Sequence, residues 1–299
     1  MELRQLRYFG AVFKERNLTR AAQALGMGSS ALSEQIMALE REMGVPLFRR
    51  TPSGMVPTAA GQALAPHAHA VVSAAGVARR AVEQSAGAAR RWRVGVTPGS
   101  PHELVARVWD ALRGAGIAAE PVDASTAEQL DAVRVGSLEV GLVCLPIDAR
   151  GMRTALVSDV PLGVLMADGH PLAERSEVAW PDLADQELLW FPRELAPGYH
   201  DDVLAVCRAA GWWPTLRARP PRRALFTAEL LAARRLVALR PVTSQADGPG
   251  LVWRPLGSAP RLRHALVWAG PGTDTASVGS GAPAVTEIMA DVAAALSIR

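Results

Sequence analysis

The sequence predicts a multidomain α/β protein with a small helical N-terminal domain, a long linking helix and a larger C-terminal α/β domain of two lobes. Apolar residues recur at helical spacing through the first 43 residues, and small apolar residues continue at that spacing over 59–89. From residue 91 strand and helix patterns alternate. With 299 residues the chain exceeds the usual size of one compact domain.

Charge is distributed unevenly along the chain. Residues 1–93 contain 13 Lys and Arg against 6 Asp and Glu, a net charge of +7, whereas residues 94–299 contain 19 against 23, a net charge of −4. A basic segment joined to a mildly acidic one indicates that the first part binds a polyanion. No apolar run reaches the length of a membrane span, and the charged start lacks the apolar core of a signal peptide. We therefore expect a cytoplasmic protein without membrane association.

Three short helices are predicted at the N-terminus. Residues 3–13 carry an apolar stripe at helical spacing. Thr19 is expected to cap a second helix that Gly26 ends, and Ser29 or Ser30 is expected to cap a third. Two helices joined by a tight glycine-containing turn form a helix-turn-helix.

The third helix has an apolar side and a polar side. Its apolar stripe consists of Leu32, Ile36, Leu39 and Met43, at which the helix is expected to end. We expect the opposite side to enter the DNA major groove, where the N-terminal residues of such a helix reach base edges. The candidate DNA-contacting residues on this helix are Ser29, Ser30, Ser33, Glu34 and Met37, with Arg41 on the same side.

A hairpin and a long helix follow. Arg49 and Arg50 precede the turn sequence at residues 52–54, and arginines on such a wing neutralise phosphates. Thr58 is expected to cap a helix over residues 59–89. The apolar residues of this helix are mostly small, which favours close packing against a second copy.

The C-terminal part is predicted to contain two α/β lobes. Alternation of strands and helices predicts a parallel sheet with helices on both faces, and the number of units predicts two lobes. Expected strands lie at 92–97, 118–122, 140–145, 162–166, 188–191, 236–239 and 264–268, and expected helices at 102–112 and up to residue 135 after a capping box at Ser125 and Glu128.

Ser100 and Ser125 are candidate ligand-binding residues. Each is expected where a strand runs into a helix N-terminus, at which backbone N–H groups favour an anionic ligand. Simple N-capping is the alternative, and both roles are compatible because they use different parts of the hydroxyl group. Pro146, Phe191 and Thr227 are further candidates for lining a ligand site.

Two arginines are candidates for pairing with a carboxylate. They are Arg193 and Arg222, for which solvated surface positions are the alternative.

Two patterns that resemble catalytic or metal-binding motifs do not have the spacing or context that these functions need. The glycine pattern at 114–119 follows a helix and not a strand, so it predicts a turn. His67 and His69 would point about 200° apart on the long helix and cannot share a metal.

The remaining residues argue further against an enzyme. No GxSxG sequence is present. Cys144 and Cys207 lie far apart without metal-site spacing, so we expect two buried thiols. We therefore expect no enzymatic activity, no metal and no cofactor.

Many N-terminal residues match the pattern of a known family. The matching residues are Thr19-Arg20-Ala21-Ala22, Leu25, Leu32-Ser33, Ile36, Leu39-Glu40, Gly44-Val45-Pro46-Leu47-Phe48, Arg50, Thr58 and Gly61. Residues 136–141 and the segment His170-Pro171-Leu172-Ala173 match elements farther along. The chain resembles LysR-type transcription regulators over nearly its whole length, most closely up to residue 61.

The resemblance implies a domain organisation. It is a winged helix-turn-helix DNA-binding domain, a linker helix for dimerisation, and an effector-binding domain similar to periplasmic binding proteins. The expected bounds are 1–58, 59–90 and 91–299, with lobe I at about 92–160 and 275–299 and lobe II at about 161–270.

The resemblance also implies partners. They are dyad-symmetric double-stranded promoter DNA, a second or further copies in a homodimer or homotetramer, a small anionic or aromatic effector, and RNA polymerase as a candidate. It adds Thr19 and Arg20 to the candidate DNA contacts. Family members usually carry Gln where Ser29 stands and often Arg where Glu34 stands, so no operator sequence is implied. Residues 191–193 with 207–214 resemble a subgroup that responds to intermediates of aromatic catabolism.

Two alternatives to an effector-controlled regulator stay open. One is the same fold with an unresponsive C-terminal domain that serves only as an oligomerisation scaffold. The other is an enzyme or solute-binding protein with an added helix-turn-helix. The lack of a nucleophile, metal or cofactor motif argues against the enzyme, and the lack of a secretion signal argues against the solute-binding protein.

Overall fold

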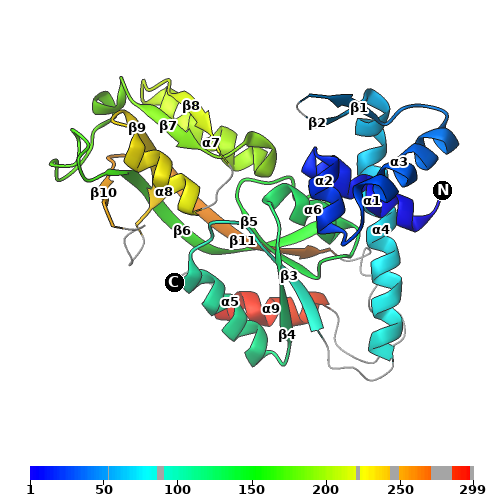
Figure 1. The fold of residues 1–299 in the computed structure, drawn as a ribbon. Helices are drawn as coiled ribbons and strands as arrows, with labels where there is room; N and C mark the ends of the chain where they lie inside the picture. Colours follow the sequence, from blue (N-terminus) through cyan, green and yellow to red (C-terminus); the bar gives the residue numbers. More distant parts are fainter. Residues whose placement is uncertain (53, 86–90, 220–222, 243–248, 271–284, 297–299) are drawn as a thin grey trace. The chain divides into compact units, whose positions relative to one another are not determined.

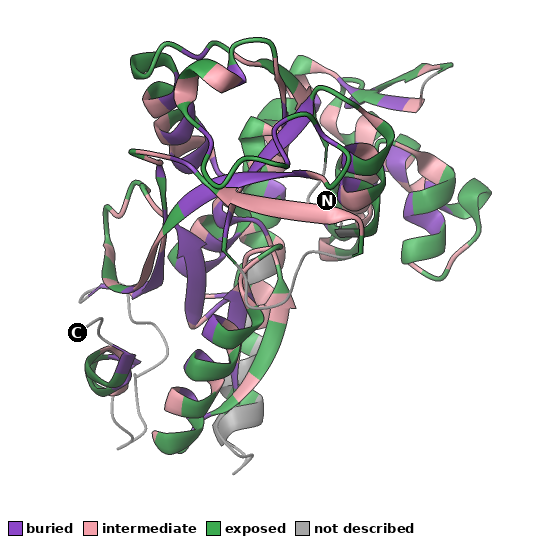
Figure 2. Cartoon of the chain, turned by 90° about the vertical axis from the view of Figure 1, so that its left-hand side faces the viewer, coloured by how far each residue is buried: buried purple, intermediate pink, exposed green. Residues whose placement is uncertain are grey.

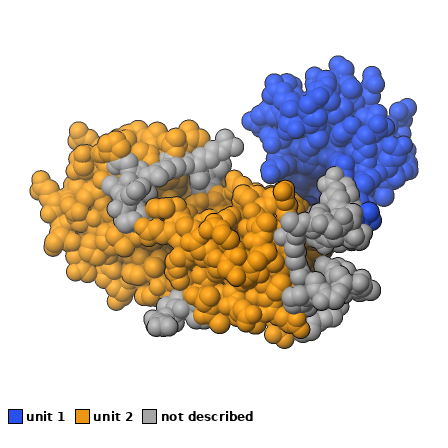
Figure 3. All heavy atoms as spheres, turned by 90° about the horizontal axis from the view of Figure 1, so that it is seen from below, with its two compact units in different colours: residues 1–88 blue, residues 89–299 orange. Residues whose placement is uncertain are grey.

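The computed structural model divides the chain into two compact units, Met1–Ala88 and Ala89–Arg299, coloured separately in Figure 3. It describes all residues except 53, 86–90, 220–222, 243–248, 271–284 and 297–299. Several expectations therefore lie outside the described residues: those for Ser53, for Arg222, for the end of the long helix and for much of residues 275–299. Among the described residues, no helix combines the length and the apolar character needed to cross a membrane.

Unit 1 begins with three helices that share one core. They are α1 (Leu3–Glu15), α2 (Leu18–Ala24) and α3 (Ser29–Met43), labelled in Figure 1. Phe9 is fully buried among them, and its ring centroid lies 5.2 Å from that of Phe48. The predicted helix-turn-helix is therefore confirmed.

Two predicted helix caps are wrong. α2 is capped by Asn17, whose Oδ1 accepts a hydrogen bond from the Arg20 N–H at 3.0 Å, so Thr19 lies inside the first turn. α3 begins at Ser29 itself, after Gly28 as N-cap, and has no side-chain cap. The serine hydroxyls at the start of α3 are therefore not used to cap this helix.

A hairpin, the wing, follows α3. Its strands are β1 (Phe48–Thr51) and β2 (Gly54–Pro57), which pair antiparallel as predicted. Glu40 on α3 fixes the entry to the wing, because its Oε1 accepts hydrogen bonds from the N–H groups of Leu47 (2.8 Å) and Phe48 (3.0 Å). The wing is therefore tied to the helix that precedes it.

The long helix α4 (Ala59–Ser85) starts at the predicted cap. Oγ1 of Thr58 accepts a hydrogen bond from the Gly61 N–H at 3.1 Å and donates one to the Pro46 carbonyl at 2.7 Å. A Cβ at Gly61 would overlap the Leu47 carbonyl oxygen, so the close approach of helix and loop requires glycine here.

Unit 2 contains a curled mixed sheet. Its strand order is β4-β3-β5-β11-β6-β9-β7-β8, and β10 pairs with β6. The strands are β3 (Arg91–Val96), β4 (Ala118–Asp123), β5 (Val140–Cys144), β6 (Met152–Ala167), β7 (Glu187–Trp190), β8 (Thr215–Ala218), β9 (Leu236–Pro241), β10 (Leu251–Pro255) and β11 (Arg261–Ala269). The helices are α5 (His102–Gly114), α6 (Thr126–Arg134), α7 (Pro197–Ala209), α8 (Arg223–Ala232) and α9 (Val285–Leu296), with short 3-10 turns η1 (Trp180–Leu183) and η2 (Arg193–Leu195).

The expected parallel sheet is only partly right. β3 pairs in parallel with β4 and β5, and β7 pairs in parallel with β8 and β9. β11 and β6 run antiparallel to their neighbours. β8 and β10 were not expected from the sequence.

In lobe I, helices cover both faces of the sheet. Successive side chains of a strand point to opposite faces. Leu142 and Leu266 accordingly pack in the core with α5 and α9, whereas Val143 and Val267 pack beside α6. α5 and α9 lie side by side on their face (Figure 1). Figure 2 shows buried strands inside the sheet and more exposed ones, which agrees with the fully buried β5 and the mostly exposed edge strand β4.

Lobe II repeats this arrangement. Val237 and Leu239 of β9 share a core with residues of α7, whereas Leu236 and Ala238 share one with Phe226 of α8. Two layers of helices with a sheet between them confirm the predicted α/β lobe.

The two lobes are joined by long strands. β6 pairs with β11 over residues 152–161 and with β9 over residues 162–165. β11 also pairs with β5, and its Leu266 and Trp268 belong to the core of lobe I. The later part of β11 therefore lies in lobe I, which differs from the expected end of lobe II near residue 270.

Candidate functional site

The outward side of α3 is a polar surface. The stripe of Leu32, Ile36 and Leu39 is buried in the core of unit 1, so the other side of the helix faces solvent. Met37 is 46% exposed, which is high for a large apolar side chain. The exposed residues on this side are Ser29, Ser30, Glu34, Met37 and Arg41, and Ser33 is half-buried.

Arg50 joins the wing to this surface. Its Nη2 donates a hydrogen bond to Oγ of Ser33, so strand β1 and helix α3 contribute to one continuous polar face. Arg49 is also exposed, but neighbouring side chains of a strand point to opposite faces. The structure therefore brings Arg50 and Ser33 together and leaves Arg49 on the other side of the wing.

Thr19 and Arg20 are exposed on α2. The Arg20 guanidinium is already engaged, because Nη2 donates to the Glu15 carbonyl at 2.8 Å and Nε lies 3.7 Å from a carboxylate oxygen of Glu15. Its charge is partly balanced within unit 1.

Unit 2 contains a cavity of about 300 Å³, at the small end of the range for small-molecule pockets. Residues from both lobes line it. One wall is aromatic: the rings of Phe191 and Tyr199 are stacked, with centroids 5.8 Å apart, and the ring of Trp190 lies 4.9 Å from that of Phe191. Such a wall suits an apolar or aromatic ligand body.

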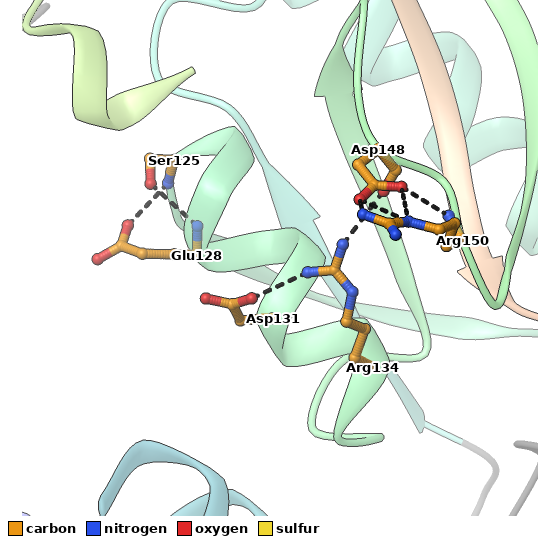
Figure 4. Close-up of polar contacts among 6 residues, drawn as sticks. All are labelled: Ser125, Glu128, Asp131, Arg134, Asp148 and Arg150. Atoms are coloured by element: carbon orange, nitrogen blue, oxygen red, sulfur yellow. Dashed lines mark hydrogen bonds and ion pairs between the residues drawn. The ribbon is translucent and has the colours of Figure 1, made fainter. Parts of the chain in front are cut away.

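Two helices begin beside the cavity, and they begin differently. α6 has the predicted capping box: Oγ of Ser125 accepts from the Glu128 N–H (3.2 Å), and Oε2 of Glu128 accepts from the Ser125 N–H (2.9 Å), as drawn in Figure 4. α5 has Pro101 as N-cap and no side-chain cap. Ser100 is therefore not a cap, and its hydroxyl donates instead to the Thr97 carbonyl at 2.8 Å.

The far end of α6 is also fixed. Arg134 pairs with Asp131 at 3.0 Å and donates to the carbonyl of Asp148 at 3.1 Å, in the loop after β5 (Figure 4). The start and the end of this helix are thus both held within lobe I.

A buried glutamine links the segments that follow β3 and β4. Nε2 of the fully buried Gln129 donates to Oγ1 of Thr97 (3.0 Å) and to the Ala124 carbonyl (2.7 Å). Gly95 and Gly141 make room for it, since a Cβ at either position would lie 2.6–2.8 Å from the Gln129 side chain. This side chain positions both the turn before α5 and the turn before α6.

Two titratable groups in the cavity wall are neutral near pH 7. Burial lowers the pKa of His264 to about 4, and this side chain is only 1% exposed. On the neighbouring strand, directly opposite, burial raises the pKa of the Cys144 thiol to about 12. Cys144 and Cys207 are both buried and free, as expected, and burial also raises the pKa of Cys207 to about 12.

Arg240 brings positive charge to the cavity. Of the described residues that line it, Arg240 is the one arginine or lysine, and none is an aspartate or glutamate. Arg240 is not among the residues expected from the sequence, although an arginine at the end of a buried strand is a signal that can indicate a ligand site. Its guanidinium carbon lies 5.3 Å from the ring centroid of Phe226, which supports it by a cation–π contact.

The predicted effector residues divide into two groups. Ser100, Ser125 and Phe191 line the cavity. Pro146 and Thr227 do not, although the Pro146 carbonyl packs closely against the start of α7.

The expectation for Arg193 is corrected. This guanidinium forms a bidentate ion pair with Asp201, with N–O distances of 2.6–3.1 Å, and does not line the cavity. Arg193 lowers the pKa of Asp201 to about 2. The arginine thus already has a carboxylate partner in its own chain.

Comparisons with known proteins agree with this architecture. Residues 3–62 match the family described as bacterial regulatory helix-turn-helix protein, lysR family, and residues 85–278 match the LysR substrate binding domain. The chain belongs to the LysR family. As a LysR-type transcription regulator it binds DNA through its helix-turn-helix domain and a small effector through its C-terminal domain.

Individual relatives match this chain over most of its length. It is 31% identical over 278 residues to the HTH-type transcriptional regulator BudR of Raoultella terrigena, covering 90% of this chain and 94% of the relative. It is 29% identical over 277 residues to the Hca operon transcriptional activator HcaR of Escherichia coli (strain K12), covering 90% and 92%. The fold is similar to the crystal structure of CbnR, a LysR family transcriptional regulator, with a TM-score of 0.64 at 20% identity and full coverage of both chains.

Proposed function

We propose that the outward side of α3 enters the major groove while the wing contacts the DNA backbone. The contact between Arg50 and Ser33 carries this proposal, because it joins the wing and the helix into one face. Ser29, Ser30 and Met37 then face base edges, and Arg50 neutralises a phosphate. Glu34, exposed on the same side, disfavours nearby phosphates and favours a cytosine amino group.

The DNA-binding form is a dimer joined through α4. Val71, Ala74 and Ala78 are exposed on this helix at spacings of three and four residues, which places them on one side. An exposed apolar stripe of small side chains fits close packing against the same helix of a second copy. Pairs of such dimers give the tetramer.

The cavity of unit 2 holds a small anionic effector with an apolar or aromatic body. The aromatic wall, the uncapped start of α5 and Arg240 support this assignment. Residues of both lobes line the cavity, so an effector that contacts both shifts the population toward one arrangement of the lobes. The protein acts in the cytoplasm on promoter DNA, by binding and not by catalysis.

The experiment is a salt titration of DNA binding by the full chain. A duplex is first selected from a random-sequence pool with the purified protein, and affinity is then measured by fluorescence anisotropy at several salt concentrations. We expect a steep linear fall of log affinity with log salt, and a slope smaller by about 1 for Arg50→Ala. Arg7→Ala, on the exposed side of α1, is the matched control and keeps the slope of the parent. An affinity that does not change with salt would contradict the proposal.

A further inference from the structure

We propose that Arg240 selects a monocarboxylate effector and holds its carboxylate against the uncapped first turn of α5. This inference rests on the proposed role of the cavity as the effector site. Beyond that role, Arg240 is named as the residue that discriminates acids from neutral molecules, and the ligand carboxylate is placed at the end of the cavity next to α5.

The guanidinium of Arg240 contacts the Phe226 ring but has no carboxylate partner among the described residues. Two other arginines of lobe II do have one: Arg217 pairs with Glu187 at 2.7 Å, and Arg219 pairs with Glu229 at 2.7 Å. A half-buried guanidinium whose cavity has no acidic residue in its described lining is free to pair with the anion of a ligand.

The position of Arg240 links the two lobes. The residue belongs to β9 of lobe II, and its backbone is fixed because the Trp253 indole N–H donates to its carbonyl at 2.9 Å. Its Nη1 nevertheless lies 3.7 Å from the place that a Cβ on Gly99 would take, in the turn before α5 of lobe I. An anion between the two is therefore reached from both lobes.

The first turn of α5 supplies the second half of the anion site. Backbone N–H groups at a helix start carry partial positive charge and favour anions. Pro101 has no side-chain acceptor for them. At α6 the capping box already engages the N–H groups of Ser125 and Glu128, so we place the carboxylate at α5 and not at α6.

Two buried side chains give independent evidence that the cavity is built for a ligand. His264 is 1% exposed and Trp190 is 3% exposed, and both line the cavity. Nδ1 of His264 and Nε1 of Trp190 have no hydrogen-bond partner in the described part of the chain. Unpaired polar groups at such sites are unusual in folded proteins, and an oxygen of a bound ligand is a suitable partner for the indole N–H.

A single cation and one helix start favour one carboxylate over a dianion. The aromatic rings and leucines around it favour an apolar body. The expected ligand is thus a compact carboxylic acid with an aromatic or similarly flat apolar group.

The test compares acids with amides of the same shape on the full-length protein. Isothermal titration calorimetry is run with three matched pairs: benzoate and benzamide, phenylacetate and phenylacetamide, and cinnamate and cinnamamide. At least one acid is expected to bind saturably at millimolar concentration or below, at least about tenfold tighter than its amide. Arg240→Gln is expected to lower acid affinity roughly 10- to 100-fold and to leave amide binding unchanged.

Two further variants keep the test decisive. Arg240→Lys retains the charge and is expected to keep the preference for acids at reduced affinity. Arg113→Gln, at the exposed far end of α5, is the matched control and is expected to bind acids as the parent does. Thermal unfolding of each variant shows that it is folded.

Three results would overturn the proposal: no acid of the panel binds at millimolar concentration, amides bind as tightly as acids, or folded Arg240→Gln keeps the affinity of the parent for acids. Salt-dependent DNA binding is measured on the same samples. If it persists while acids fail, the Arg240 assignment falls and the proposed DNA interface stands.

Discussion

α5 and α6 begin at the same edge of the sheet of lobe I, yet only α5 lacks a side-chain cap. α6 closes its own first turn with Ser125 and Glu128, whereas α5 follows Pro101 and has no side-chain cap. Both starts lie beside a cavity that contains an arginine and, among its described lining residues, no carboxylate. Two similar helix starts therefore have different roles, one structural and one suited to receive an anion.

The first prediction has the largest expected effect. It concerns His264, whose uncharged side chain lies in the wall of the cavity beside both helix starts. The folded-state pKa of His264 is about 4, below the usual value of 6.5, so the unfolded chain takes up a proton first as the pH falls. Stability is therefore retained above pH 6.5 and lost between pH 6.5 and 4, by about 3 kcal/mol. Buried His170, whose pKa burial also lowers, acts in the same direction.

Urea unfolding of unit 2 in the full chain at several pH values measures this loss. His264→Leu is expected to lose less stability than the parent over the same interval. Identical pH dependence in parent and variant would show that folding leaves the pKa of His264 unchanged, which would contradict the effect assigned to its burial.

The second prediction concerns Gln129, whose side chain holds the segments before both α5 and α6. Gln129→Met fills a similar volume but leaves the Ala124 carbonyl and the Thr97 hydroxyl without their shared donor. We expect a loss of about 2 kcal/mol in the free energy of unfolding. Gln62→Met, on the exposed side of α4, is the matched control. A loss below about 0.5 kcal/mol would mean that the turns before α5 and α6 are held independently of Gln129.

The third prediction makes α5 resemble α6. Pro101→Asp places a carboxylate at the N-cap, where it accepts hydrogen bonds from the first turn and competes with a bound acid. We expect the affinity for the tightest-binding acid of the panel to fall at least about tenfold in calorimetry. Pro101→Ala leaves the helix uncapped and is expected to bind the acid nearly as the parent does. Equal affinity in all three proteins would place the carboxylate elsewhere.

The smallest effect is expected at α6. Ser125→Ala removes the cap and is expected to lower the free energy of unfolding by about 1 kcal/mol. Ser100→Ala is the matched comparison and is expected to cost less, because Ser100 does not cap α5. Thermal unfolding of the two variants side by side checks the order, and a reversed order would refute the assigned caps.

Local sequence signals predicted much of this chain. The stripe of Leu32, Ile36 and Leu39 gave α3 and its outward side, because helical periodicity depends on neighbouring residues only. The capping box at Ser125 was predicted for the same reason: its partner, Glu128, is three residues away. Thr19 failed as a cap because Asn17, also a good cap, lies two residues earlier.

Features that depend on distant residues were not predicted. The antiparallel direction of β11 depends on pairing with β5 and β6, which precede it by about a hundred residues. β8 is mostly exposed and lacks the apolar alternation that marks a buried strand. Arg240 lies near Gly99 only in the folded chain. The expectation for Arg193 failed because no local sequence signal indicates its ion pair with Asp201.

The most direct measurement is a crystal structure of the full chain with the tightest-binding acid of the panel. The carboxylate is expected within about 3 Å of the Arg240 guanidinium and of backbone N–H groups in the first turn of α5, with the apolar body against Phe191 and Tyr199. A carboxylate bound at the start of α6, or anywhere out of reach of Arg240, would contradict the account.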